Sequence, residues 1–210
     1  MNLLDFVGTV VLVTASGALA PGPLFFGLLT HDSNEGARAG FSCAIGHTMV
    51  ELPLVLALAL GLLAAASQPV IKTGIGLFGG IGLVGFGIQQ LYGTIKTKQR
   101  RNDNKAIGLP ASSLVLGLAL TGLNPYFILW WLTVGSMLIV QALSFAAIVG
   151  VLIMYVAHVW MDFAFLSGIA HLAKKGKTIV GSQHYRIVLV AFGLILIGYG
   201  FKFLVDAVGI

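Results

Sequence analysis

Long apolar runs separated by short polar segments dominate the chain. A helix needs about 20 apolar residues to cross the roughly 30 Å hydrocarbon core of a bilayer. Four runs meet this requirement as single helices, although one of them contains a single acid, Glu51. These runs are Phe6–Thr30, Ala39–Ala66, Thr73–Ile95 and Ile187–Val205. Each of them predicts one membrane-spanning helix.

A fifth apolar run is too long for one crossing. Ala111–Met161 holds 51 residues without Asp, Glu, Lys or Arg, and as one helix it would be about 77 Å long. It must therefore fold back and cross twice, and we expect the turn within Gly135–Ser144. The pattern thus predicts an all-α membrane protein with six transmembrane helices. We expect one transmembrane domain over residues 1–210, with half one at 1–95, a cytoplasmic linker at 96–110 and half two at 111–210.

Composition agrees with a chain that resides in lipid. The 210 residues are 58% apolar and 9% charged, whereas typical soluble domains carry about 25% charged residues. We therefore exclude a soluble enzyme, a nucleic-acid-binding protein and a disordered chain. The net charge of +5 comes from short basic clusters between apolar runs, which is not the pattern of a nucleic-acid-binding surface.

Lysines and arginines are concentrated on one side of the predicted topology. Ten of the twelve fall in the loops that follow spans 1, 3 and 5. Because cytoplasmic loops carry an excess of Lys and Arg, we expect these loops in the cytoplasm and both termini outside the plasma (cytoplasmic) membrane. The segment Met1–Asp5 has no basic residue, and prolines follow the first apolar stretch. We therefore expect an uncleaved first helix and not a signal peptide.

Prolines interrupt two of the predicted helices in matching places. Span 1 contains Pro21-Gly22-Pro23, and span 4 contains Asn124-Pro125. Proline removes an amide donor and clashes with the preceding turn, and unpaired backbone groups are costly in lipid. Each break lies in the first helix of its half. Because each half has three spans, an odd number, the two halves face opposite ways across the membrane.

Broken helices in two inverted three-helix repeats are typical of secondary transporters. In such folds the helix N-terminus after each break presents free amide groups to an anionic part of the substrate. We therefore expect a midplane substrate site at the two breaks, with kinks that only shape packing as the alternative. The candidate substrate-binding residues are Pro21, Gly22, Pro23, Asn124 and Pro125.

Four ionisable residues lie well within the predicted spans: His47 and Glu51 in span 2, and His158 and Asp162 in span 5. The members of each pair are four residues apart and so share one helix face. At 1.5 Å per residue from the cytoplasmic end, Glu51 and His158 lie about 15 and 13 Å deep. His47 and Asp162 lie about 9 and 7 Å deep. Antiparallel spans would bring Glu51 level with His158 and His47 level with Asp162, although the two pairs are not strict copies under the repeat.

These residues have three alternative roles. They could exchange protons, since imidazole titrates near neutral pH and interacting groups share their protons. They could bind a divalent metal, because two imidazoles and two carboxylates suit Zn²⁺ or a similar ion. They could also be structural pairs that pin two helices together. Since a charge at bilayer depth costs at least about 2.5–3.5 kcal/mol, a functional role is the default expectation.

Several other residues are expected to serve packing. Trp130, Trp131 and Trp160 are expected to pack or to anchor the protein, as membrane aromatics commonly do, with contact to the substrate as the alternative. Gly76 and Gly80 have GxxxG spacing and predict a close helix–helix contact. The single cysteine, Cys43, cannot form an internal disulfide.

Short motifs in both halves resemble those of a known family. Ala20-Pro21-Gly22-Pro23, Glu35–Gly40 and Ile45-Gly46-His47 resemble the opening of the lysine exporter (LysE/RhtB) family, and Leu123-Asn124-Pro125 resembles its second-half motif. The resemblance covers the whole chain in length, span count and loop placement. It implies a six-helix exporter of amino acids or related small metabolites that is driven by an ion gradient.

We therefore expect a secondary active transporter that exports a small, amino-acid-like solute by proton antiport. Glu51 and Asp162, tuned by His47 and His158, would carry protons or bind an ammonium group. The alternative is a divalent metal cation exporter that uses the same four residues. A membrane enzyme is disfavoured, because no Ser–His or two-metal arrangement occurs within the spans. The expected partners are the solute, protons, the bilayer and a second copy in a homo-oligomer, with no cofactor and no nucleic acid.

Overall fold

The computed structural model describes residues 2–19, 22–30, 35–65, 69–96, 112–175 and 183–208, and all regular structure among them is helical. The elements are α1 (Leu3–Ala18), α2 (Pro23–Thr30), α3 (Ala37–Ala65), α4 (Pro69–Lys96), α5 (Ser113–Gly122), α6 (Pro125–Trp130), the π-helical turn η2 (Trp131–Gly135), α7 (Ser136–Lys174) and α8 (Gln183–Val208). By length and composition, three of the described helical segments can cross a membrane, namely Ala37–Leu62, Tyr126–Lys174 and Arg186–Val208. The number is four when the bent α1–α2 pair is counted as one span. The predicted all-α class is confirmed for these residues. Of the predicted linker 96–110, only Lys96 lies within them.

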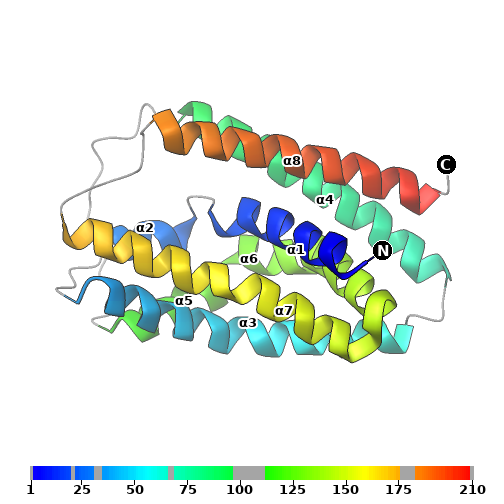
Figure 1. Cartoon of the computed structure of the whole chain (residues 1–210), viewed down its shortest axis with the longest axis horizontal. Helices are drawn as coiled ribbons and strands as arrows, with labels where there is room; N and C mark the ends of the chain where they lie inside the picture. Colours follow the sequence, from blue (N-terminus) through cyan, green and yellow to red (C-terminus); the bar gives the residue numbers. More distant parts are fainter. Residues whose placement is uncertain are drawn as a thin grey trace.

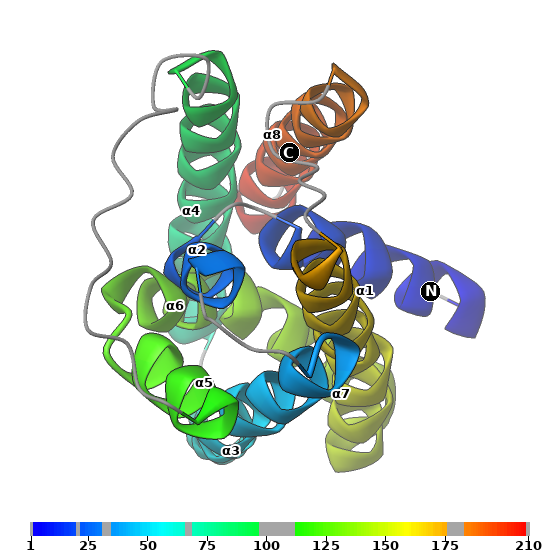
Figure 2. The same cartoon turned by 90° about the vertical axis from the view of Figure 1, so that its left-hand side faces the viewer.

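The bundle is built on two antiparallel helix pairs, α4 with α8 and α3 with α7. Figures 1 and 2 show α1, α2 and α6 between these pairs. The glycine face predicted on α4 is confirmed, because a Cβ at Gly76 would lie 2.7 Å from Ala207, and one at Gly80 would lie 2.8 Å from Leu204. Small residues thus let α4 and α8 approach closely, as is usual in membranes.

Glycines also bring α3 against two neighbours. A Cβ at Gly40 of α3 would collide with the carbonyl oxygen of Leu166 on α7. A Cβ at Gly117 of α5 would collide with the carbonyl oxygen of Cys43 on α3. These backbone contacts hold α5 and α7 directly against the stretch of α3 that carries the ionisable residues.

Both predicted helix breaks occur. The axes of α1 and α2 differ by 59°, and Pro23 is the first residue of α2. In the second half α5 ends at Gly122, and Pro125 begins α6. The side chain of Asn124 caps α6 by accepting a hydrogen bond from the amide of Tyr126 at 3.0 Å. Proline is well placed at such a start, because the first helical amide has no intrahelical partner.

The turn that follows the second broken helix differs from the prediction. It lies within α7 at Ala146 and Ala147, whose backbone is not helical, and not within Gly135–Ser144. Ala147 has φ 50° and ψ −136°, a conformation that is strained for alanine. A Cβ at Gly150 would collide with the carbonyl oxygen of Ala142, so the chain folds back at once. Small residues therefore permit the reversal, while Ser136 stays helical and donates its hydroxyl to the carbonyl of Trp131 at 2.9 Å.

Two apolar clusters lie on either side of the ionisable residues along α3 and α7. One cluster includes Val55 of α3 and Met154 of α7. The other includes Ala44 of α3 and Leu166 of α7. The segments 47–51 and 158–162 therefore lie between two apolar cores.

Candidate functional site

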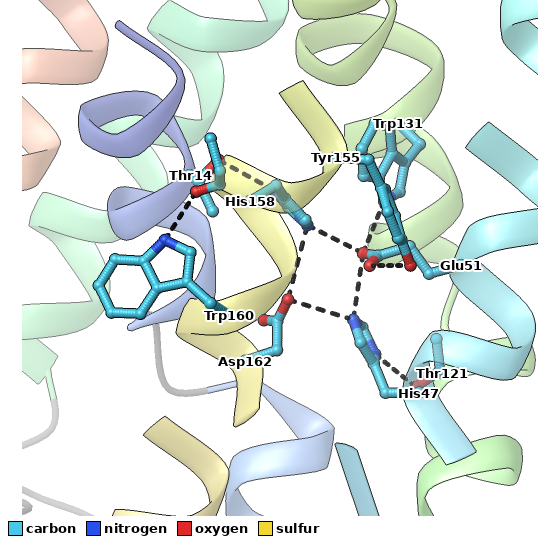
Figure 3. A network of polar contacts seen from close by, with 10 residues as sticks. Thr14, His47, Glu51, Thr121, Trp131, Tyr155, His158, Trp160 and Asp162 are labelled. Carbon is cyan, nitrogen blue, oxygen red and sulfur yellow. Dashed lines mark hydrogen bonds and ion pairs between the residues drawn. The ribbon is translucent and has the colours of Figure 1, made fainter. Parts of the chain in front are cut away.

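The four ionisable residues predicted to form a cluster meet where α3 crosses α7, as Figure 3 shows. His47 Nε2 lies 3.1 Å from Glu51 Oε1, and His158 Nε2 lies 3.0 Å from the same oxygen. Asp162 Oδ2 lies 3.6 Å from His158 Nε2 and 4.0 Å from His47 Nε2. We call these four residues the ring. The predicted matching of Glu51 with His158 and of His47 with Asp162 is confirmed.

The four residues of the ring are almost completely buried. Glu51 is 1% exposed, His158 5%, and His47 and Asp162 8% each. Because apolar clusters lie on both sides, charges within the ring interact more strongly than they would in water.

Glu51 has two further partners. Trp131 Nε1 donates to Glu51 Oε1 at 3.2 Å, and the hydroxyl of Tyr155 donates to Glu51 Oε2 at 3.3 Å. Trp131 packs in the apolar core, as expected, and its indole also reaches a carboxylate on another helix. Tyr155 could have been found from the sequence, because it precedes His158 by three residues and so shares its helix face. Trp131 offers no comparable signal.

Asp162 is in a different situation. Its Oδ2 atom is buried and has no hydrogen-bond partner among the described residues. The same holds for Nε1 of Trp130, which lies beside Gly17 in the last turn of α1. Buried polar groups are normally satisfied, so an acceptor and a donor of this kind are candidates for contact with a ligand.

Two threonines outside the ring contact its histidines. Thr14 Oγ1 lies 2.9 Å from Nδ1 of His158, and Thr121 Oγ1 lies 2.9 Å from Nδ1 of His47. Both threonines are buried, at 0% and 2% exposure. Sequence reasoning missed them. Their position near the ends of α1 and α5, shortly before the two breaks, was the available signal.

The candidate substrate-binding residues begin the helices that follow the breaks. Gly22 and Pro23 lie at the start of α2, and Asn124 and Pro125 lie at the start of α6. Pro21 lies outside the described residues. The helices around the two breaks touch, because a Cβ at Gly27 of α2 would collide with Leu120 of α5.

The ring atoms are spaced as a small cation would require. One ligand atom from each of His47, Glu51 and Asp162 lies within 4.8 Å of the others. Nitrogen and oxygen alternate around the ring, with sides of 3.0, 3.1, 3.6 and 4.0 Å. Ligands about 2.1 Å from a tetrahedral ion lie roughly 3.4 Å apart. The group whose ligand atoms lie close enough together for one ion consists of His47, Glu51 and Asp162.

Comparison with curated proteins finds no match, and comparison with solved structures finds none. A family model described as LysE type translocator matches residues 15–207. The matched region includes both breaks and all four members of the ring. The chain therefore belongs to the LysE type translocator family and is a membrane transporter.

Proposed function

We propose that this translocator is a secondary active exporter of amino acids or similar small metabolites that works by proton antiport. The observation that carries the proposal is that the two carboxylates of the ring have unequal surroundings. Glu51 is surrounded by hydrogen-bonding side chains, whereas Asp162 Oδ2 is buried without a hydrogen-bond partner beside two imidazoles. A carboxylate in this position can take up a proton or a cation without breaking a hydrogen bond. We assign the ring to transport and not to catalysis, since the family consists of translocators.

The helix arrangement supports six crossings in two inverted halves. In this proposal, half one crosses as α1–α2, α3 and α4. Half two crosses as α5–α6 with the first part of α7, then as the remainder of α7, and finally as α8. The main pairs, α3 with α7 and α4 with α8, join equivalent spans of the two halves. Figure 1 shows the start of α1 and the end of α8 at the same end of the bundle, which an even number of crossings requires. We place that end outside the plasma membrane, from the distribution of basic residues.

We place the solute between the two breaks and the ring. The positive ends of the helix dipoles at the starts of α2 and α6 and the indole of Trp130 would attract an anionic group of the solute. Asp162 would bind an ammonium group of the solute or a proton, but not both at once. This competition is the physical basis of antiport, because one occupant must leave before the other enters.

The direct test uses purified protein in liposomes that enclose a pH-sensitive dye. Each of the common amino acids is added in turn, and solute-dependent proton movement is recorded. We expect a response to a subset of them, and we expect the Asp162→Asn variant to abolish it. An exposed acid on α8, Asp206, provides the matched control Asp206→Asn, which should retain the response. A response of wild-type size in Asp162→Asn would contradict proton coupling through the ring.

The second candidate substrate is a divalent cation. The alternation of nitrogen and oxygen atoms around the ring favours it. The observed sides of 3.0–4.0 Å bracket the separation expected for Zn²⁺ ligands. The threonine at each Nδ1 would orient the imidazole, as partners of metal-binding histidines commonly do. Titration of the purified protein with Zn²⁺, Mn²⁺ and Cd²⁺ tests this candidate. Binding should weaken at least about tenfold in His47→Ala, and the absence of saturable binding in the wild-type protein would reject it.

A further inference from the structure

The ring is connected to both broken helices through contacts that the proposed proton exchange does not use. Thr14 lies on α1, the helix that precedes the first break, and Thr121 lies on α5, the helix that precedes the second. Their hydroxyls contact Nδ1 of His158 and of His47, each at 2.9 Å. No other hydrogen bond is recorded at either Nδ1 among the described residues.

The contacts cross between the two halves. His47 belongs to half one and contacts Thr121 of half two, whereas His158 belongs to half two and contacts Thr14 of half one. Each histidine therefore joins a carboxylate through Nε2 and the opposite half's broken helix through Nδ1. A change in the direction of the hydrogen bond at Nδ1 of one histidine therefore changes a contact of the helix that precedes the break in the other half.

The chemistry of imidazole determines what each threonine must do. In a neutral histidine that donates from Nε2 to a carboxylate, Nδ1 carries a lone pair, so the threonine hydroxyl donates to it. In an imidazolium both nitrogens donate, so the same hydroxyl must accept. Its own proton then needs another acceptor. The carbonyl four residues earlier in the helix is the usual choice, which is Val10 for Thr14 and Gly117 for Thr121.

We propose that Thr14 and Thr121 are positioning residues that transmit the protonation state of His158 and His47 to the ends of α1 and α5. A threonine hydroxyl that bonds to the carbonyl four residues earlier slightly destabilises and bends its helix. Protonation of a histidine therefore loosens the helix end beside a break, where the solute is proposed to bind. This inference rests on the proposed proton coupling.

The charged and titratable groups around the two histidines are few. Each histidine faces the other and the carboxylates of Glu51 and Asp162. The hydroxyl of Tyr155 faces Glu51 from α7. On α1 and α5 the contacting groups are the two threonine hydroxyls, which do not titrate in this range.

The test follows the histidines and the helix ends separately in wild-type protein held in lipid nanodiscs. Side-chain nitrogen NMR reports protonation of His47 and His158 between about pH 5 and pH 8. Hydrogen exchange, expressed as protection factors, reports the amides of residues 17–19 and 121–123. We expect protection at both helix ends to fall about three- to tenfold as the histidines become charged, the size expected for one hydrogen bond.

Matched variants assign the effect to each threonine. Thr14→Val should remove the pH response at the end of α1 and leave that of α5 intact, and Thr121→Val should do the reverse. The serine variants keep the hydroxyl and should retain both responses, and alanine replaces valine if either valine variant does not fold. Thr9→Val is the control on α1, because the Thr9 hydroxyl bonds only to the carbonyl of Asp5, at 2.8 Å.

Two results would overturn the inference in distinguishable ways. If the histidine signals titrate but the valine variants keep the wild-type response at the helix ends, the threonines do not transmit protonation. If the wild-type histidine signals do not titrate in this range, the threonines have no change in protonation to transmit and the inference fails, while the liposome assay with Asp162→Asn still decides the proposed proton coupling.

Discussion

Glu51 and Asp162 hold comparable positions in the two halves, since each follows a histidine by four residues and each faces the other half's histidine. Their surroundings differ sharply. The carboxylate of Glu51 has hydrogen-bonding contacts with two imidazoles, an indole and a phenol, all within 3.3 Å. Asp162 Oδ2 has its nearest imidazole nitrogen at 3.6 Å and no hydrogen-bond partner among the described residues.

The difference arises from side-chain length and from the neighbours that half two supplies. Glu51 is one methylene longer than Asp162, so its oxygen reaches both imidazoles. The π-helical turn places Trp131 beside Glu51, and α7 places Tyr155 there. Two similar carboxylates can thus have different roles. In the proposed mechanism, Glu51 holds the ring together, while Asp162 is available for exchange.

The largest effect is expected from Glu51→Gln. Removal of this charge leaves two imidazoles and an aspartate without the group that joins them, and breaking a buried ion pair costs about 3–5 kcal/mol. We expect a large loss of stability together with loss of proton-coupled transport. Chemical denaturation in detergent measures the first, and the liposome assay measures the second. Wild-type stability would show that Glu51 is not the anchor of the ring.

Gly40→Ala should disturb the Asp162 side of the ring more than the Glu51 side. The added Cβ would collide with the carbonyl oxygen of Leu166, four residues beyond Asp162, and must separate α3 from α7 there. Overpacking of this kind costs about 1–3 kcal/mol. On the same helix, Gly61 has no atom within 4 Å of an added Cβ, so Gly61→Ala is the control. A double-mutant cycle with Asp162→Asn should show coupling for Gly40 and none for Gly61.

Asp162→Asn should separate function from stability. Because no hydrogen bond to Oδ2 is lost and the imidazole nitrogens lie 3.6 and 4.0 Å away, we expect a smaller loss of unfolding free energy than for Glu51→Gln, about 1 kcal/mol. Transport should nevertheless fall to background, since the amide cannot take up a proton. The same two measurements as for Glu51→Gln apply here. A stability loss equal to that of Glu51→Gln would remove the distinction between the two acids.

Tyr155→Phe is expected to have the smallest effect on transport. It removes a single hydrogen bond to Glu51 at 3.3 Å and keeps the aromatic ring. The expected cost is about 0.5–1.5 kcal/mol, and the two carboxylates become more alike. Measuring transport against external pH would sharpen the comparison, because a less strongly held Glu51 should shift the pH profile without abolishing transport. An unchanged profile would show that Tyr155 contributes only packing.

Much of the helical framework could be predicted because its causes are local. The apolar run Ala39–Ala66 corresponds closely to α3 at Ala37–Ala65, and Pro23 and Pro125 begin helices after the breaks, as proline chemistry requires. The ring could be predicted as well, since helical spacing and depth place Glu51 beside His158. The turn at Ala147 could not, because it depends on the contact of Gly150 with Ala142 and not on a turn-forming residue.

The chain by itself determined its class, its breaks and which ionisable groups meet, because bilayer thickness, helix periodicity and the missing amide of proline act within short stretches of sequence. Tertiary structure decided how those groups differ. Trp131 and Tyr155 reach Glu51, and Thr14 and Thr121 reach the histidines, only after distant helices have packed. No local pattern encodes such contacts, since each depends on the close approach of two backbones.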